Sequence, residues 1–354
     1  MEIKLPFYAR LALVLLCLVL IIYLLYIGQS VLIPLFFAIQ ISLLLYPLAC
    51  IMEQRLGMKR WLASLVSVTL FVVAFAGFVY LLSYEVLLFS HDIPLLQKSL
   101  TNMMADIQQW TTDNYGIDST QQMVYMQQAA NNIVSYAAGT FSSLFVEVSN
   151  LIFWIVIIFI YTYFILNHRR LLANFIKGVF RKEYEDKVTH VLIETRAITN
   201  SYMVGLLIEF VFVAIAYCLG FLLLGIKYAV LLGLIAAALN IIPYLGFIIA
   251  SVLVLLVTMM HSSWVLALQA LALLFVLHVI DANILFPKVV GDKVKMNPLT
   301  TIVGVLTGGA LWGVAGMFLS IPIVAMLKLI FENVESLEPW ALLMGTDDDK
   351  KADK

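Results

Sequence analysis

Long apolar runs dominate the sequence and restrict what this chain can fold into. Two of them, Ala229–Met260 and Leu299–Phe331, extend over 32 and 33 residues and include one charged side chain, Lys328. Hydrophobic residues make up 63% of the chain and charged residues 12%, whereas ordinary soluble domains carry roughly 25% charged residues. A soluble globular fold is therefore excluded, and the sequence predicts an all-α, polytopic membrane protein.

Shorter apolar stretches predict full membrane spans. A hydrocarbon core of roughly 30 Å requires about 20 apolar residues in a helix. Six stretches meet this length: Phe7–Ile27, Val31–Met52, Trp61–Tyr84, Leu144–Leu166, Tyr202–Leu224 and Trp264–Phe286. The first is followed at once by a second apolar run and not by a signal-peptidase-like cleavage site, so we interpret it as a retained span.

Basic residues orient the predicted spans, because cytoplasmic loops are enriched in Lys and Arg. Residues 53–60 contain three basic side chains and residues 167–200 contain seven, whereas residues 85–145 contain only Lys98. The first two segments are predicted inside and the third outside, which places the amino terminus in the cytoplasm. Apolar residues at helical spacing on both sides of the turn NYGID predict that the external segment is a helical insert.

The first overlong run predicts a re-entrant hairpin. As one helix it would be about 48 Å long at 1.5 Å per residue. Its centre reads LNIIPYLGF, where Pro243 has no N–H and disfavours helical geometry at Ile242, and Gly246 adds backbone freedom. If the run doubles back here, the lysine-rich loop 287–298 lies in the cytoplasm. A single crossing would place that loop outside, against the charge rule.

The second overlong run repeats this design and returns the carboxyl terminus to the cytoplasm. Pro298 starts the run and Pro322 lies in its returning half, with four glycines interrupting it between them: Gly308, Gly309, Gly313 and Gly316. Each hairpin follows a full span, so the two span-plus-hairpin units predict an inverted repeat, an architecture that recurs in membrane carriers. An alternative is that the two GxxxG patterns formed by Gly304, Gly308, Gly309 and Gly313 allow close helix packing.

The chain is accordingly predicted to contain about six full spans, two re-entrant hairpins and a small extracytoplasmic insert. Residues 182–200 are expected to form a cytoplasmic amphipathic helix that continues into the fifth span. The predicted segments are a scaffold of three spans (1–84), the extracytoplasmic helical insert (85–143), the fourth span with the amphipathic helix (144–200), the two inverted span-plus-hairpin units (201–334) and a cytoplasmic tail (335–354).

Polar side chains inside the predicted spans are candidate functional residues, because such groups are costly in lipid and mark pathways or buried pairs. They are Glu209, Asn240, His278, Asp281 and Asn283. His278 and Asp281 are three residues apart and share a helical face. In a proton-coupled mechanism, Glu209 or the His278 and Asp281 pair would titrate. The alternative for Asp281 and Asn283 is that they cap or brace the helix before Pro287.

The sequence lacks the motifs that are typical of several other functions. Neither HExxH nor a GxGD-type aspartate pair is present, so we expect no enzyme activity. The three cysteines are far apart and lack metal-like spacing, so we expect no disulfide and no metal. We also expect no cofactor and no nucleic-acid partner. A passive oligomeric channel and a structural scaffold remain alternatives to a carrier.

Three ordered motifs between Ser201 and Phe331 resemble those of a known family. They read LNIIPYLG, DANILFPKVVG and MNPLTTIVGVLTGGALWGVAGMFLSIPIVAMLKLI. With these motifs the chain resembles the AI-2E transporter family, also called PerM-like permeases. The resemblance implies a multi-pass protein of the bacterial plasma (inner) membrane that forms homo-oligomers, with a pentamer as one such assembly. It implies a secondary transporter that exports a small polar solute such as autoinducer-2, with cation/proton antiport as the alternative.

The resemblance also assigns individual residues. The family's IPYxG motif corresponds to Ile242, Pro243, Tyr244 and Gly246, its acidic-x-Asn pair to Asp281 and Asn283, and its flanking prolines to Pro287 and Pro298. The chain departs from the pattern at Leu206, where the family often has glutamine, while Glu209 lies nearby. The glycine and serine motif of the antiporter branch is also missing, which makes cation exchange the weaker reading.

The expected mechanism is alternating access. Half-helix ends carry partial charges, so hairpin tips that meet near the midplane would bind a small polyol or anion with the help of Asn240 and Tyr244. The predicted pathway further comprises Glu209, Pro243, Gly246, His278, Asp281 and Asn283, together with the glycines of the second hairpin, Gly308, Gly309, Gly313 and Gly316. Pro287, Pro298 and Pro322 are expected hinges, and H+ or Na+ is the expected coupling ion.

Overall fold

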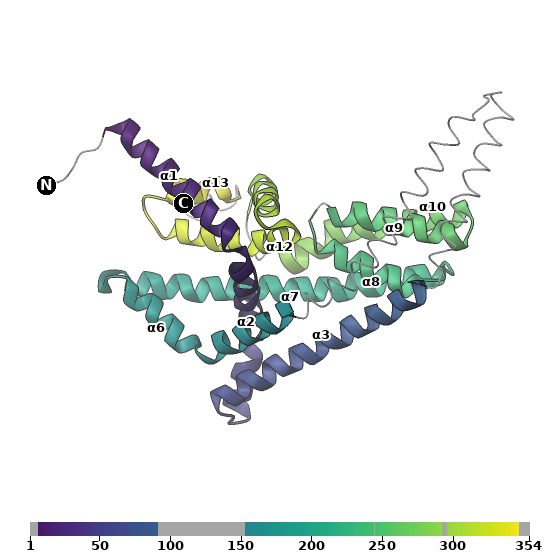
Figure 1. Ribbon diagram of the computed structural model, residues 1–354, viewed down its shortest axis with the longest axis horizontal. Helices are drawn as coiled ribbons and strands as arrows, with labels where there is room; N and C mark the ends of the chain where they lie inside the picture. The colour runs from purple at the N-terminus through teal and green to yellow at the C-terminus, as the bar shows by residue number, and fades with distance from the viewer. Residues whose placement is uncertain (1–5, 91–152, 244, 292–295, 347–354) are drawn as a thin grey trace. The chain divides into compact units, whose positions relative to one another are not determined.

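The computed structural model describes residues 6–90, 153–243, 245–291 and 296–346, and these residues are almost entirely helical (Figure 1). Six helices among them are long and apolar enough to cross a membrane. They are α1 (Phe7–Ile27), α2 (Gln29–Arg55), α3 (Arg60–Ser90), α7 (Glu185–Leu223), α10 (Trp264–Ile280) with its π-helical continuation, and α12 (Pro298–Glu332). The prediction of an all-α polytopic membrane protein is confirmed.

The described part of the predicted fourth span forms a bent pair of helices. The helix Phe153–Asn167 is followed by α6 (Arg169–Val179) at an angle of 72°. After a short 3₁₀ turn, η1 (Lys182–Tyr184), α7 continues for 39 residues. The predicted amphipathic helix at 182–200 is thus the first part of a helix that runs on without interruption through the fifth span. Most of the predicted extracytoplasmic insert, residues 91–143, lies outside the described residues.

The chain divides into two compact units. One comprises Met1–Thr69, Ile155–Gly205 and Val290–Lys354, and the other Leu70–Trp154 and Leu206–Val289. The long helices α3 and α7 each begin in the first unit and end in the second.

The second unit contains the first predicted hairpin. Two short helices, α8 (Ala229–Asn240) and α9 (Leu245–His261), have 12 and 17 residues, or about 18 and 26 Å at 1.5 Å per residue. Neither is long enough to cross a core of about 30 Å. The ring of Tyr228, before α8, lies 5.4 Å from the ring of His261, at the end of α9. The segment therefore returns to where it started, as a hairpin does.

Small residues let α8 pack closely against α7, and α7 against α10. A Cβ atom at Gly233 of α8 would lie 2.8 Å from the Cα atom of Cys218 on α7. A Cβ atom at Gly220 of α7 would lie 2.6 Å from a methyl group of Leu273 on α10. The buried core of the unit is built from these helices, and the aromatic side chain of Phe221 is completely enclosed in it. The hairpin is thus an integral part of the unit.

The first unit contains the second predicted hairpin, which lies within α12. Trp312 and Gly313 leave helical geometry there, and Gly313 has φ of +61° and ψ of −143°, a conformation that glycine adopts readily. Beyond this break the chain doubles back, because a Cβ atom at Gly304 would touch Val324 and one at Gly308 would collide with Gly316. These contacts are the close helix packing that the GxxxG alternative predicts, made within the hairpin itself.

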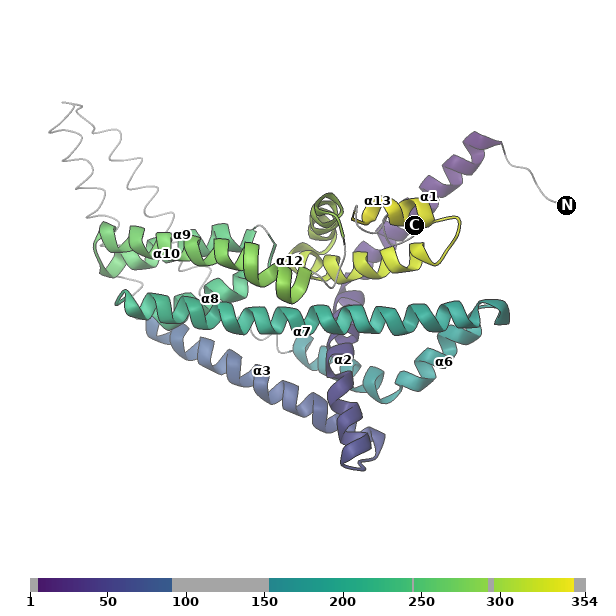
Figure 2. The same cartoon turned by 180° about the vertical axis from the view of Figure 1, so that it is seen from behind.

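The start of α12 is fixed by polar contacts. Asn297 caps the start of the helix, since its Oδ1 atom accepts a hydrogen bond of 2.8 Å from the backbone N–H of Thr300. Its Nδ2 atom donates to the carbonyl oxygen of Leu343, at 2.6 Å. Leu343 belongs to α13 (Glu338–Met344), a short helix within the predicted tail that lies beside the end of α12 (Figure 2). Pro298 occupies the first turn of α12, where its missing N–H is tolerated.

Candidate functional site

A cluster of three polar side chains lies inside the second unit. The Nδ2 atom of Asn240 donates a hydrogen bond of 2.8 Å to Oδ2 of Asp281 and a longer one of 3.4 Å to Oε1 of Glu209. One amide therefore bridges two carboxyl groups that come from α7 and from the end of α10. All three residues were predicted from the sequence as pathway residues, and the structure brings them together.

Both acidic side chains of this cluster are buried. Glu209 is 6% exposed and Asp281 is 5% exposed. Within the described part of the chain, Oε2 of Glu209 and Oδ1 of Asp281 have no hydrogen-bond partner. Burying a charged carboxylate without a partner is costly, so the two unsatisfied oxygens have the chemistry to bind a cation, a proton or a hydrogen-bonding ligand.

The position of Asn240 follows from the local sequence. It is the last residue of α8, and the helix cannot continue past it because Pro243 has no backbone N–H. The turn is closed instead by the N–H of Ile242, which donates to the carbonyl oxygen of Leu239 at 2.8 Å. Gly246 is required there, because a Cβ atom at this position would collide with the same carbonyl oxygen. The break in the hairpin thus presents Asn240 to the cluster.

Asp281 stands where α10 changes its winding. Residues Asp281–Leu285 form a π-helical turn, η2, and Pro287–Gly291 form a second one, η3. Pro287 cannot donate to the carbonyl oxygen of Asn283, which removes one α-helical bond at this place. The N–H of Phe286 donates to the carbonyl oxygen of Asp281 in the wider π pattern. Such turns are rare and frequently occur at functional sites.

His278 lies one helical turn before Asp281, as predicted, and is held by an aromatic contact. Its ring stacks on Phe247 of α9 with centroids 4.3 Å apart and planes inclined by 16°. Its Nδ1 atom is buried and, among the described residues, has no hydrogen-bond partner. Phe247 and Phe275 also line an apolar groove of about 580 Å³ between α9 and α10. Sequence reasoning missed Phe247, because an aromatic residue in an apolar run carries no distinguishing signal.

Asn283 does not join the cluster. Its side chain is exposed, and its Nδ2 atom donates to the carbonyl oxygen of Val279 at 2.8 Å. This contact braces its own helix, as the alternative reading of the sequence proposed. The side chain of Asp281 is buried instead and accepts the hydrogen bond from Asn240, while its role in a pathway stays a prediction. Tyr244 lies outside the described residues.

The remaining predicted pathway residues belong to the other unit. Gly308 and Gly316 face each other inside the α12 hairpin, Gly309 packs against Met317, and Gly313 makes the turn. Pro322 is buried in the returning half. The meeting of the two hairpin tips and the hinge roles of Pro287, Pro298 and Pro322 stay predictions.

The described residues contain no group of three or more His, Cys, Asp or Glu side chains that could hold a metal ion. The ligands of the cluster are two carboxyl groups and one amide. Carboxylate oxygens are hard donors, which suit protons and hard cations better than soft transition metals.

Over nearly its whole length, the chain is similar to known membrane transport proteins. The family described as AI-2E family transporter matches residues 15–336. YueF and YrrI of Bacillus subtilis (strain 168), each named "Putative transport protein", are both 26% identical to this chain, over 86% and 85% of it and over 85% and 86% of their own lengths. The "AI-2 transport protein TqsA" of Escherichia coli (strain K12) is 24% identical over 90% of both chains.

Proposed function

The chain belongs to the AI-2E family of membrane transporters, and on this premise we propose that it is a secondary transporter that exports a small polar solute. The observation that carries the proposal is the buried cluster of Glu209, Asn240 and Asp281. Acidic groups inside a membrane protein usually mark an ion or proton pathway. The cluster lies at the break of a hairpin, where carriers with broken helices bind their solutes and ions.

The two carboxyl groups form the proposed coupling site. Their negative charges lie in the buried interior, where the dielectric constant is low and a cation is therefore attracted more strongly than in water. In the proposed cycle H+ or Na+ binds at the unpartnered oxygens, Oε2 of Glu209 and Oδ1 of Asp281. Each bound cation cancels one negative charge of the two carboxylates and so lowers the cost of keeping this charge in the apolar interior.

Asn240 couples the ion to the solute. It ends α8, where backbone carbonyl groups lack helical partners, and its amide is shared by both carboxyl groups. A polyol that hydrogen-bonds to this amide competes with the carboxylates for the same donor. Solute binding therefore weakens the hydrogen bonds that the carboxylates receive from Asn240. This in turn changes the affinity of the carboxylates for the cation. The autoinducer-2 named for TqsA is the first solute to test on this chain.

The proposed motion is alternating access, in which one repeat moves against the first four spans. The hairpin geometry supports this, since α8 and α9 are each too short to anchor across the bilayer by themselves. We place the chain in the bacterial plasma membrane with both termini in the cytoplasm, and we propose that it works as a homo-oligomer.

Cation/proton antiport is the second candidate function. The paired carboxyl groups favour it, because such a pair can bind protons and cations in turn. In this case the transported species is the cation itself, and no organic solute moves. A channel differs from both, because its flux neither saturates nor follows the gradient of a second ion.

Flux measurements in proteoliposomes test the proposal and separate these candidates. The purified chain is reconstituted, an inward or outward gradient of H+ or Na+ is imposed, and the movement of a panel of polyols, anions and cations is followed. We expect saturable solute flux that reverses with the ion gradient. Asn240→Ala and Asp281→Ala should abolish it while Gln269→Ala, an exposed polar position on α10, leaves it intact. Unimpaired flux in both cluster variants would contradict the assignment of the site.

A further inference from the structure

Helix α6 differs in character from the spans on either side of it. It reads RRLLANFIKGV, and helical geometry places its apolar side chains on one side, namely Leu171, Leu172, Phe175, Ile176 and Val179. Arg170, Asn174 and Lys177 lie on the opposite side. A helix of this kind, with one apolar and one basic polar face and too few apolar residues to span, is typical of the membrane interface.

The apolar face of α6 is uncovered. No residue of the helix is buried, and Phe175, at its centre, is 67% exposed. The side chains of Leu171 and Val179, one turn or more away at either end, are about equally open at 66% and 64%. If these five apolar side chains were in contact with water, the exposed apolar surface would raise the free energy of the protein.

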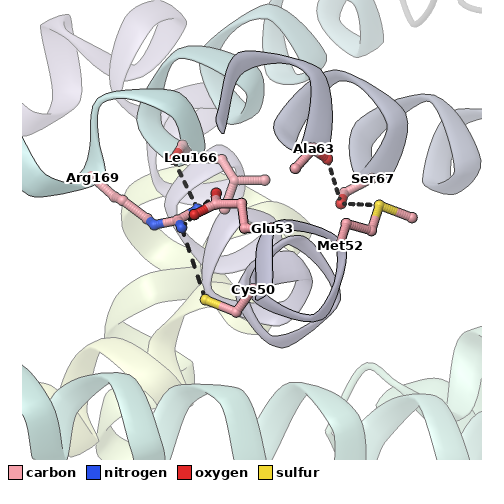
Figure 3. Close-up of polar contacts among 7 residues, drawn as sticks. All are labelled: Cys50, Met52, Glu53, Ala63, Ser67, Leu166 and Arg169. Carbon is pink, nitrogen blue, oxygen red and sulfur yellow. Dashed lines mark hydrogen bonds and ion pairs between the residues drawn. The ribbon is translucent and has the colours of Figure 1, made fainter. Parts of the chain in front are cut away.

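The direction of α6 is fixed by contacts of its first residue (Figure 3). Arg169 donates through Nη2 to Oε1 of Glu53 on α2, at 2.7 Å, and through Nη1 to the carbonyl oxygen of Leu166, at 3.4 Å. Its guanidinium group also lies 5.0 Å from the ring centre of Tyr46. The ion pair is largely shielded from solvent, with 14% and 16% of the two side chains exposed. These contacts hold the bend of 72° between α6 and the preceding apolar helix.

We infer that α6 is an interfacial helix that binds the anionic phospholipid surface of the membrane leaflet at which the preceding helix ends. Its apolar side chains insert among the upper acyl chains, and Arg170 and Lys177 contact lipid phosphate groups. The bilayer is the occupant that the observations favour, because α6 directly follows the apolar helix Phe153–Asn167 and is turned by 72° from the direction of that helix.

The basic side chains of α6 also favour the lipid bilayer as its binding partner. Residues 167–200, which include α6, contain seven basic residues, and this count predicts a cytoplasmic location. The cytoplasmic leaflet is the one that carries negative surface potential. The helix therefore brings basic side chains to an anionic surface and apolar side chains to acyl chains. A second protein chain would need an apolar partner surface but would not explain the basic edge.

Site-directed fluorescence on the full-length protein tests this inference. In a background in which Cys17 and Cys218 are replaced by Ala and Cys50 by Ser, a small environment-sensitive fluorophore is attached at Phe175→Cys or at Asn174→Cys. Phe175 belongs to the apolar face of α6, and Asn174, about 100° further round the helix, belongs to the polar face. Val73→Cys on α3, 64% exposed and in the middle of an apolar span, provides the reference for a label within the bilayer. The protein is reconstituted in vesicles of phosphatidylcholine with or without phosphatidylglycerol.

We expect the label at Phe175→Cys to be quenched severalfold more by lipids with brominated acyl chains than the label at Asn174→Cys. Aqueous iodide should show the reverse order. In mixed vesicles, brominated phosphatidylglycerol should quench the label at Phe175→Cys more than brominated phosphatidylcholine does. Arg170→Gln combined with Lys177→Gln should remove this preference for the anionic lipid while the insertion of the apolar face remains.

Two outcomes would overturn the inference. If iodide reaches both α6 labels equally, the helix is in water and not at the interface. If the label at Phe175→Cys is shielded from iodide and from brominated lipid alike, protein covers the apolar face. Because the label at Val73→Cys must respond to brominated lipid in the same preparation, a failure of reconstitution is recognised separately. Solute flux does not enter this readout, so the result is independent of the proposed transport site.

Discussion

The side chains of Asn240 and Asp281 are 41 positions apart in the sequence and are joined by a hydrogen bond of 2.8 Å, donated by the Asn240 amide. The same amide reaches Glu209 at 3.4 Å. One side chain at the break of a hairpin thus connects the acidic groups of two long helices. Changes to this residue should affect both the stability of the unit and transport.

Asn240→Ala removes the only amide that bridges the two carboxyl groups in the described cluster. Leaving buried acceptors unsatisfied costs about 1–3 kcal/mol, so we expect a lower midpoint of thermal unfolding in detergent together with lost transport. Asn240→Gln retains the amide and should restore part of both. A variant without Asn240 that keeps full stability and full flux would show that the bridge is unimportant.

Glu209→Gln keeps the shape of the side chain but removes its titratable group. If Glu209 binds the coupling ion, this variant should still bind solute but should no longer accumulate it against a gradient. Counterflow, in which labelled solute exchanges for unlabelled solute without a driving ion, measures the first property, and gradient-driven flux measures the second. Equal loss of both activities would point to a folding defect or a direct solute contact instead.

Gly308→Ala should destabilise the hairpin in α12. The added methyl group would collide with the carbonyl of Gly316 and with the hydroxyl of Ser320, and overpacking of this kind typically costs about 1–3 kcal/mol. Gly77→Ala is the matched control, because nothing lies within 4 Å of a Cβ atom at that position on α3. Thermal unfolding of the two variants, measured side by side, should show a lower midpoint for Gly308→Ala alone.

The ion pair between Arg169 and Glu53 should couple α6 to α2. Removing either partner leaves the other charge in a largely shielded place, where an unpaired charged hydrogen-bonding group costs about 1–3 kcal/mol or more. We therefore expect Arg169→Ala and Glu53→Ala to be clearly non-additive in a double-mutant cycle of unfolding free energies. Additive effects would indicate that the contact contributes nothing by itself.

The helices and their breaks could be predicted from the sequence, whereas the contacts between distant side chains could not. The breaks were readable because Pro243 and Gly313 act on the backbone locally, whatever surrounds them. Asn240 and Asp281 were each recognisable as polar residues in apolar runs. Their contact was not predictable, since it depends on how the hairpin packs between α7 and α10. The same reason explains why Glu53, the acidic residue of the basic segment 53–60, was not identified as the partner of Arg169.

Helix α6 was overlooked for a different reason. The seven basic residues of the segment 167–200 were used only to orient the chain. The low overall hydrophobicity of α6 hid its regular apolar face. Asn283 shows the limit of motif reasoning in the opposite direction. It matches the family pattern as well as Asp281 does, yet one side chain points into the cluster and the other braces its own helix, because their positions on the π-helical turn differ.

The most direct test of the transport site is the ion movement that accompanies one solute. In proteoliposomes loaded with a pH-sensitive or a sodium-sensitive dye, solute added outside at no applied voltage should drive a dye response in the wild-type protein. The account predicts that Asp281→Asn abolishes this coupled response while the exposed Gln269→Ala control retains it. A full dye response in Asp281→Asn, with solute flux like that of the wild type, would contradict the proposal that this buried carboxyl group binds the coupling ion.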